Sequence, residues 1–364
     1  MNLKFATEYE LILEKLDQID PVRYGRTRNY VDGAVTCLSP YISRGVISSR
    51  QVLKSVLEKG YKITQIGSFV KELCWRDYFQ RVAQIKELTT DIKQAQSPVL
   101  NHGIPVQILN ATTGIEGIDN AIKQLYEHGY MHNHCRMYTA SLVCNIAKSY
   151  WYHPAQWMYY YLLDGDWASN ACNWQWVSGA NSRKKYYANQ ENINKYTFTD
   201  QTSTYLDKSY EELETNETPA QLCDTQKVIL ETELPVTSEV QLNSTLPTFL
   251  YNYYNLDPLW HKDEPGNRIL LLEPDFFSNY PVSKDCIHFM LALSKNIPDM
   301  QIYVGSFKSF LDKYKVKNSY YKEHPLNSGY IGNIEERDWI AEGVSGYYPA
   351  FFSYWKQVEK HLYK

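Results

Sequence analysis

The sequence contains no run of about 18 apolar residues, the length that a membrane-spanning helix requires. Its first residues alternate charged and apolar side chains, so they do not resemble a secretory signal. The seven cysteines are scattered and form no CxxC pair, which is typical of reduced thiols rather than of disulfides or a zinc site. These absences predict a cytoplasmic protein that neither spans a membrane nor holds a structural metal.

The composition is that of a folded protein, because 44% of the 364 residues are hydrophobic and 21% are charged. Aromatic residues reach 15%, enough to fill a core or to stack on a flat ring. Residues 198–247 hold ten acidic and two basic side chains, whereas residues 1–197 have a net charge of +5. The basic part suits contact with phosphates, although chance and a solvated linker would give the same pattern.

The spacing of apolar residues predicts a mostly helical domain over residues 1–197. The helices are expected at residues 44–58, 64–88, 114–127, 131–150, 154–163 and 167–177. Thr113 and Glu116 are spaced as a capping box, and Gly129 is expected to end the helix that follows them.

The second half of the chain has a different sequence pattern. Residues 198–247 predict an acidic, partly extended linker with little periodicity. In residues 248–364 strand-like and helix-like segments alternate, which indicates a small α/β domain with a parallel sheet. The expected fold class is therefore a mostly α domain followed by a small α/β domain.

The segment FVKELCWRDYFQRV places an unusual set of side chains on one helix face. Glu72, Trp75, Arg76 and Phe79 are spaced at i, i+3, i+4 and i+7. Because buried charges must be paired, this face is unusual for a core. The ordinary alternative is a surface pair between Glu72 and Arg76 beside a core tryptophan.

The segment YMHNHCRMYTASLVCN could form either a second polar helix face or a metal site. Asn133, Arg136 and Met137 share a face because they are three and four residues apart. His132 and His134 are two residues apart, so on a helix they diverge, and no further pair completes a tetrahedral set. The sequence therefore favours a polar helix face without a metal.

The segment LLDGDWASNACNWQWVSGANSRKKYY carries acids, indoles and bases in close succession. Asp164 and Asp166 flank a glycine between two expected helices, where an aspartate can simply cap the second helix. Asn170 and Trp174 share a face four residues apart. Aromatic side chains beside a basic cluster suit flipped-out or single-stranded nucleic acid, although a basic loop beside a core tryptophan is equally ordinary.

Five motifs in this order resemble the FAD-binding domain of the photolyase and cryptochrome family. They are TCLSP, ELCWRDY, HNHCRM, DGDWASN and WQW, and they cover about half of the chain. The pattern is most similar to class I cyclobutane pyrimidine dimer photolyases. The resemblance implies FAD as the cofactor, active in its reduced form. The residues that it assigns to the flavin are Tyr24, Thr36, Cys37, Leu38, Ser39, Arg76, Arg136, Asp164, Asp166 and Asn170.

The resemblance also implies a pocket for a damaged, flipped-out base pair. The residues that match this pocket are Glu72, Trp75, Asn133, Met137 and Trp176. In relatives that repair (6-4) lesions the place of Met137 is taken by histidine, so the resemblance favours the cyclobutane lesion. The expected phosphate contacts are Arg28, Arg183, Lys184 and Lys185.

The family's electron relay is matched in part. Trp174 and Trp151 correspond to its first two members, but no tryptophan lies between residues 75 and 151 to supply the third. Tyr126, Tyr150 and Trp157 remain alternatives for the end of the relay.

The chain also departs from the family in its domain order. The family places an antenna domain before the FAD domain, whereas here the α/β segment follows it as a candidate rearranged relative. That segment lacks the motif WFRxDLR, so no antenna chromophore is assigned.

Two functions remain open at this point. The resemblance implies a light-driven carbon–carbon lyase that splits pyrimidine dimers in DNA and acts as a monomer. The alternative is a cryptochrome-like blue-light photoreceptor that binds FAD and signals through residues 198–364 without repairing DNA.

Overall fold

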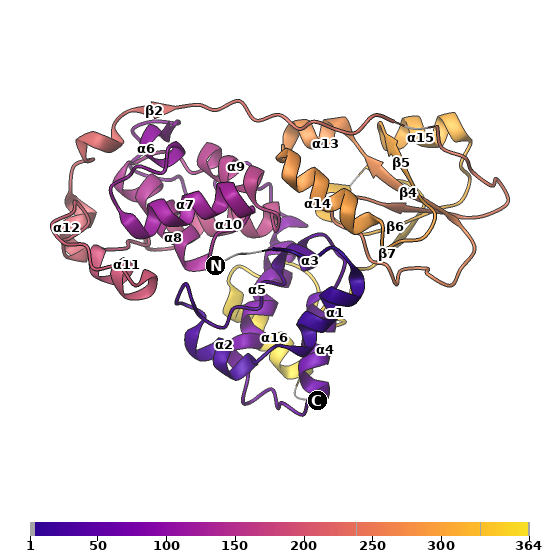
Figure 1. Ribbon diagram of the computed structural model, residues 1–364, viewed down its shortest axis with the longest axis horizontal. Helices are drawn as coiled ribbons and strands as arrows, with labels where there is room; N and C mark the ends of the chain where they lie inside the picture. The colour runs from indigo at the N-terminus through magenta and orange to yellow at the C-terminus, as the bar shows by residue number, and fades with distance from the viewer. Residues whose placement is uncertain (1–3, 238, 328, 363–364) are drawn as a thin grey trace. The chain divides into compact units, whose positions relative to one another are not determined.

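The structure is a computed structural model that describes residues 4–237, 239–327 and 329–362 (Figure 1). The chain divides into two compact units, and each unit combines segments that are far apart in the sequence. The first unit comprises Met1–Pro21, Thr36–Gln84 and Glu231–Lys364, and the second comprises Val22–Val35 and Ile85–Leu230. This division differs from the expected boundaries at residues 197 and 247, because early helices share a unit with the sheet.

The second unit is helical, as expected for this part of the chain. Its helices are α6 (Val106–Leu109), α7 (Glu116–His128), α8 (Asn133–Ser141), α9 (Tyr152–Tyr161), α10 (Trp167–Ser178), α11 (Gln190–Thr197) and α12 (Tyr210–Thr215). Helix α2 (Pro21–Thr27) begins at the division, and a 3₁₀ turn covers Ala220–Leu222. The short strands β1 (Ile104–Pro105) and β2 (Thr225–Gln226) pair antiparallel and tie part of the expected linker to this unit.

Helix α7 shows how local sequence sets a helix and its end. Its apolar side chains Ile118, Ile122 and Leu125 are buried on one face. Gly129 ends the helix at φ 62°, and a Cβ there would lie 2.6 Å from Leu163 Cγ, so glycine is required. The expected capping box is wrong, because the hydroxyl of Thr113 instead donates to Asp119 Oδ1 at 2.7 Å.

The helix expected over residues 131–150 is shorter and changes type. Helix α8 runs on into a π-helical turn at Leu142–Ile146, and Lys148 then adopts φ 55°. Such a turn widens the helix locally and often occurs near functional residues. The indoles Trp151 and Trp174, which follow on later segments, are almost completely buried in this unit.

The first unit contains a group of helices from both ends of the chain. They are α1 (Tyr9–Asp17), α3 (Ser39–Ser43), α4 (Ser49–Glu58), α5 (Gly67–Ala83) and α16 (Phe351–Leu362). A capping box fixes the start of α4, since Ser48 and Gln51 exchange side-chain and backbone hydrogen bonds. Helix α5 packs against α4 and α16, which explains why the C-terminal residues belong to this unit.

The same unit contains a five-stranded sheet whose strands are all parallel, as expected. The strands are β3 (Thr248–Tyr251), β4 (Asn267–Leu272), β5 (Met300–Val304), β6 (Ser319–Lys322) and β7 (Asn333–Glu335), in the order β5-β4-β3-β6-β7. The connecting helices are α13 (Pro274–Asn279), α14 (Lys284–Ser294) and α15 (Phe307–Tyr314), and a 3₁₀ turn lies at Pro325–Asn327. Every residue of β4 is buried, which is typical of a central strand in a parallel sheet.

Alternation along the strands gives the sheet one of its cores. Ile269 and Leu271 of β4 point to the same face and pack with Phe307 and Phe310 from α15. The end of the expected linker covers the edge strand β5, because Thr237 Oγ1 donates to the Val304 carbonyl at 3.0 Å. Within the described ranges, no helix is both long and apolar enough for a membrane span.

Candidate functional site

The expected site residues fall into both compact units. Those in the first unit are Thr36, Cys37, Leu38, Ser39, Glu72, Trp75 and Arg76. Those in the second are Tyr24, Arg28, Asn133, Arg136, Met137, Trp151, Asp164, Asp166, Asn170, Trp174, Trp176, Arg183, Lys184 and Lys185. Each group is therefore a partial site built by its own helices.

A partly buried ion pair joins α8 to the turn between α9 and α10 in the second unit. Arg136 Nη2 donates to both carboxylate oxygens of Asp164, at 3.0 and 2.9 Å. Arg136 Nε donates to the Met131 carbonyl at 2.8 Å, which fixes the guanidinium on the first turn of α8. The carboxylate is 4% exposed and the arginine side chain 21%, so the positive group keeps an accessible part. Pairing makes this burial tolerable, since an isolated buried charge would be costly.

Asp166 and Asn170 are held at the start of α10. Asp166 is the N-cap, because its Oδ2 accepts from the backbone N of Ser169 at 3.3 Å and from its hydroxyl at 2.5 Å. The capping role anticipated for an aspartate here is therefore confirmed. Asn170 Nδ2 donates to the Ala155 carbonyl at 2.8 Å and so joins α10 to α9. Both polar side chains are thus fixed in orientation before any ligand binds.

Three of the five residues expected to contact a base lie on α8 and α10, two helices that pack against each other, whereas Glu72 and Trp75 lie on α5 in the first unit. Asn133 is exposed at the first turn of α8, and Met137 is half-buried one turn later. Trp176 of α10 is 39% exposed, and its ring centroid lies 5.7 Å from that of Tyr186. An indole left this open can accept a flat ring from outside the chain.

The basic loop after α10 presents two of its three cations to solvent. Arg183 and Lys184 are exposed, whereas Lys185 is half-buried and burial lowers its pKa. Gln94 Nε2 donates to the carbonyls of Gly179 and Ser182, at 2.8 and 3.0 Å, which holds the loop in place. Arg183 and Lys184 are therefore better placed for phosphates than Lys185.

The two relay tryptophans differ in their surroundings. Trp174 is 2% exposed on α10, and Trp151 is fully buried just before α9. Trp151 Nε1 donates to Asp91 Oδ1 at 2.7 Å, and the Tyr150 hydroxyl donates to the same oxygen at 3.0 Å. Sequence reasoning missed Asp91, which lies about 60 residues away and outside any motif.

The two histidines of HNHC do not form a metal site. Among the described residues no group of three histidines, cysteines or acids could hold a metal ion. Burial is the main cause that lowers the pKa of His132 to about 4 and that of His134 to about 4. Both rings are therefore neutral near pH 7 and add no charge to the face of α8.

In the first unit, Trp75 of α5 is stacked on the C-terminal helix. Its ring centroid lies 3.8 Å from that of Phe351, with the two planes 10° apart. Phe79 lies 5.2 Å away and Tyr78 meets the indole edge-on at 5.6 Å. One face of Trp75 is therefore covered by α16, a partner that sequence reasoning did not foresee.

Arg76 and the segment 36–39 form the remaining polar part of this unit. Arg76 Nη2 donates to the Ser43 hydroxyl at 2.9 Å, which joins α5 to α3. Cys37 adopts φ 51°, a conformation that is strained for a residue with a side chain. The backbone N of Leu38 donates to Thr36 Oγ1 at 3.4 Å, and α3 begins directly afterwards. The loop thus enters a helix with two hydroxyl residues at its start.

The opposite side of α5 holds a buried carboxylate. Asp77 accepts a hydrogen bond from the backbone N of Ile340 at 2.9 Å. Burial raises its pKa to about 6, against the opposing effects of that bond and of nearby arginines such as Arg337. Arg337 Nη1 donates to Gln80 Oε1 at 2.7 Å, so the segment after β7 is tied to α5 by polar contacts.

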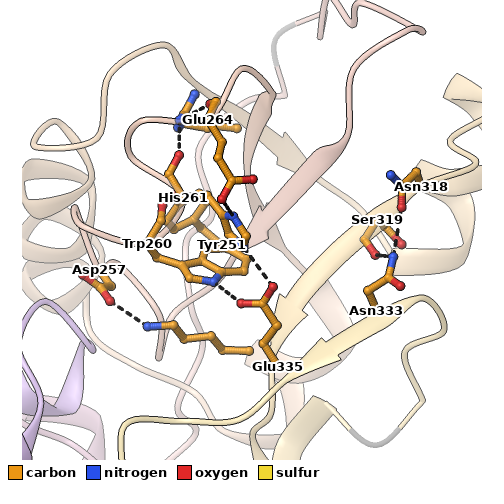
Figure 2. A network of polar contacts seen from close by, with 11 residues as sticks. Tyr251, Asp257, Trp260, His261, Glu264, Asn318, Ser319, Asn333 and Glu335 are labelled. Atoms are coloured by element: carbon orange, nitrogen blue, oxygen red, sulfur yellow. Dashed lines mark hydrogen bonds and ion pairs between the residues drawn. The ribbon is translucent and has the colours of Figure 1, made fainter.

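A second polar network lies in the sheet of this unit (Figure 2). Glu335 accepts from Trp260 Nε1 at 2.7 Å and contacts His261 Nε2 at 2.9 Å. Arg268 Nη2 donates to the carbonyls of His261 and Glu264, at 2.6 and 2.9 Å. These contacts fix the segment between β3 and β4 onto β7, which is a structural role.

Comparisons with known proteins agree on one domain type. Residues 69–248 match the family model described as the FAD binding domain of DNA photolyase. A deoxyribodipyrimidine photo-lyase of Agrobacterium fabrum is 30% identical over 179 residues, which cover 45% of this chain and 37% of the relative. A cryptochrome DASH of Ostreococcus tauri is 29% identical over 194 residues, covering 50% of this chain and 34% of the relative.

A solved structure gives a further, weaker likeness. The crystal structure of a Synechocystis cryptochrome is matched with a TM-score of 0.44 and 24% identity, covering 53% of this chain and 44% of that chain. The matched segments therefore span less than half of each of these relatives.

Proposed function

We propose that the protein repairs cyclobutane pyrimidine dimers in DNA under light, because residues 69–248 match the FAD binding domain of DNA photolyase and photo-lyases are among the relatives. The observation that carries the proposal is the ion pair between Arg136 of α8 and Asp164, which lies just before α10, together with the fixed side-chain amide of Asn170 on α10. These groups stand at the motif positions where the family resemblance expects the flavin ring.

The donor set of the chain fits FAD. Arg136 supplies a positive group and Asn170 an amide for the edge of the flavin ring, and Asp164 holds the guanidinium in place. The family resemblance also assigns Thr36 and Ser39 to the flavin, and their hydroxyls would suit its phosphate oxygens. When bound and reduced, FAD supplies the electron that light makes available to the damaged bases.

The substrate groups would be held by aromatic, acidic and basic side chains. Trp176 offers an open indole for stacking, worth about 1–3 kcal/mol per base. Glu72 is expected to accept a hydrogen bond from the edge of a thymine, and Arg183 and Lys184 to neutralise phosphates. Flipping costs a few kcal/mol and less at a damaged site, so the lesion contributes to its own selection.

The choice of lesion rests on two side chains. Asn133 and Met137 stand where relatives that repair (6-4) lesions are expected to carry histidine. Neither an amide nor a thioether can donate a proton readily at neutral pH. The cyclobutane lesion requires no such proton, because electron transfer alone splits its bonds.

A photoreceptor without repair activity is the second candidate, and one contact favours it. Phe351 covers one face of Trp75, so this indole offers less surface to a base than a free pocket tryptophan would. A cryptochrome is also among the relatives of this chain. A sensor of this kind would bind FAD and respond to light while leaving dimers intact.

The repair of a thymine dimer in a short oligonucleotide tests the proposal. The protein is loaded with FAD, reduced and illuminated, and the dimers that remain are counted against a dark sample. We expect loss of dimers only in the light, a strong reduction of this loss in Trp176→Ala, and normal loss in the control Phe352→Ala, which removes an exposed ring outside the expected pocket. Dimers that persist in the light with reduced flavin bound would support the photoreceptor instead.

A further inference from the structure

Asp91 is hydrogen-bonded to two oxidisable rings at once. Its Oδ1 accepts from Trp151 Nε1 at 2.7 Å and from the Tyr150 hydroxyl at 3.0 Å, and its Oδ2 accepts from the backbone N of Gln96 at 2.9 Å. The ring centroids of Tyr150 and Trp151 are 5.9 Å apart. The carboxylate is thus held by three donors against a buried indole and a phenol.

We propose that Tyr150 is the last electron donor of the relay in this chain and that Asp91 receives its proton. The proposal rests on the proposed function, because FAD, when bound and oxidised, would supply the light-driven oxidant at the start of the relay. Trp174 and then Trp151 would each give up an electron toward it. The step assigned to this chain is the reduction of the oxidised Trp151 by Tyr150.

Electrons and protons balance in this step. One electron passes from the ring of Tyr150 to the radical cation of Trp151, which returns to its neutral form. The O–H bond of Tyr150 breaks, and its proton forms a new O–H bond on Asp91 Oδ1. A neutral tyrosyl radical and a protonated Asp91 remain.

Tyr150 carries a proton at neutral pH, so its oxidation requires a nearby base such as the carboxylate of Asp91. Burial, followed by the hydrogen bond to Asp91, raises the pKa of Tyr150 to about 12, so the phenol keeps its proton at neutral pH. Oxidation of a phenol makes it strongly acidic, and the proton needs a base within hydrogen-bond reach. Asp91 is that base, 3.0 Å from the hydroxyl oxygen.

Two other tyrosines near the relay have different hydroxyl partners among the described residues. Tyr152 lies closer to Trp151, at 5.5 Å, but its hydroxyl accepts a hydrogen bond from the amide of Gln156. Tyr126 donates to the Leu109 carbonyl, which is a poor proton acceptor. Tyr150 is also only half-buried, and its ring centroid lies 5.2 Å from that of the exposed His102. A radical on Tyr150 would therefore lie near the surface, where a reductant from solution can reach it.

Electron paramagnetic resonance after illumination of the flavin-loaded protein identifies the radical. We expect a tyrosyl signal in the unaltered protein, and loss of most of that signal with appearance of a tryptophanyl signal in Tyr150→Phe. Tyr152→Phe is the matched control, since it removes a hydroxyl from a ring whose centroid lies at a similar distance from that of Trp151, and it should keep the signal. Only a tryptophanyl signal in the unaltered protein, or loss in Tyr152→Phe alone, would overturn the proposal.

The role of Asp91 is tested separately. In Asp91→Asn an amide oxygen can still accept from the indole but cannot take up a proton, so we expect the electron hole to stay on Trp151. A tyrosyl radical formed at the normal rate in this variant would overturn proton transfer to Asp91. The geometry has its own readout in flavin-free protein, where the indole ¹⁵N resonance of Trp151 should shift in Asp91→Asn and an unchanged resonance would contradict the hydrogen bond.

These outcomes are independent of repair. The dimer assay on chemically reduced, unaltered protein reports on the proposed function alone, because the relay is not needed once the flavin is reduced. A protein that forms the tyrosyl radical but leaves dimers intact would retain the inference and refute repair.

Discussion

The contact between Phe351 and Trp75 permits a sharp test of how the C-terminal helix is held. Phe351 is 3% exposed and stacks on Trp75 at 3.8 Å, whereas its neighbour Phe352 is 64% exposed. Phe351→Ala and Phe352→Ala therefore remove the same ring from adjacent positions of one helix. Only the first change removes a ring that packs on α5.

The expected magnitude follows from burial. Truncating a buried phenylalanine costs about 3–5 kcal/mol, part of which is the 0.5–1.5 kcal/mol typical of a stacked aromatic pair. Because Phe351 is the first residue of α16 and the helix end can relax, we expect about 3 kcal/mol. Phe352→Ala should change the free energy of unfolding by at most about 0.5 kcal/mol, as is usual for an exposed site.

A urea titration followed by tryptophan fluorescence measures both variants. The unfolding transition should move to lower urea in Phe351→Ala and stay in place in Phe352→Ala. Similar stability in the two variants would refute the packing of α16 on Trp75.

Three further changes test a buried carboxylate, the electron relay and the expected lesion pocket. Asp77→Asn keeps an acceptor for the Ile340 amide and removes a charge. The fold raises the pKa of Asp77 from 3.8 to about 6, so it favours the protonated carboxyl. The stability that this protonated carboxyl contributes is complete below pH 3.8 and is lost as the pH rises through 6. The variant should therefore gain up to about 3 kcal/mol at pH 8 and almost nothing at pH 4 in denaturation curves, and a loss at pH 8 would contradict the sign. Trp174→Phe should abolish light-driven flavin reduction, measured by absorbance, and chemical reduction should restore repair; normal photoreduction would mean another path. Glu72→Ala should lower the repair yield per absorbed photon about tenfold, the effect of one charged hydrogen bond of about 1.5 kcal/mol, while FAD stays bound; a colourless protein would show that Glu72 is structural.

Local patterns predicted the elements that local physics controls. The apolar spacing in residues 114–127 corresponds to α7, and Gly129 ends that helix because the backbone there needs φ 62°. The alternation of strands and helices after residue 248 predicted the parallel sheet. The short strands β6 and β7 and the helix α16 were missed, because they form by pairing or packing with partners elsewhere in the chain.

The partial sites show the same limit. The family resemblance assigned both Arg136 and Asp164 to the flavin, and the structure joins these two residues in an ion pair. Asp91 and Phe351 could not be anticipated, because nothing in their own segments marks them and their partners are distant in sequence. The thermodynamic reason is general: a buried polar group requires a partner, but the sequence does not say which one.

The return of ultraviolet absorbance in a dimer-containing oligonucleotide tests the central claim most directly, because each split dimer restores two pyrimidine double bonds. With reduced FAD and bound DNA, we expect the absorbance to rise under blue light and to stay constant in the dark. Flat absorbance in the light, with flavin reduced and DNA bound, would contradict it.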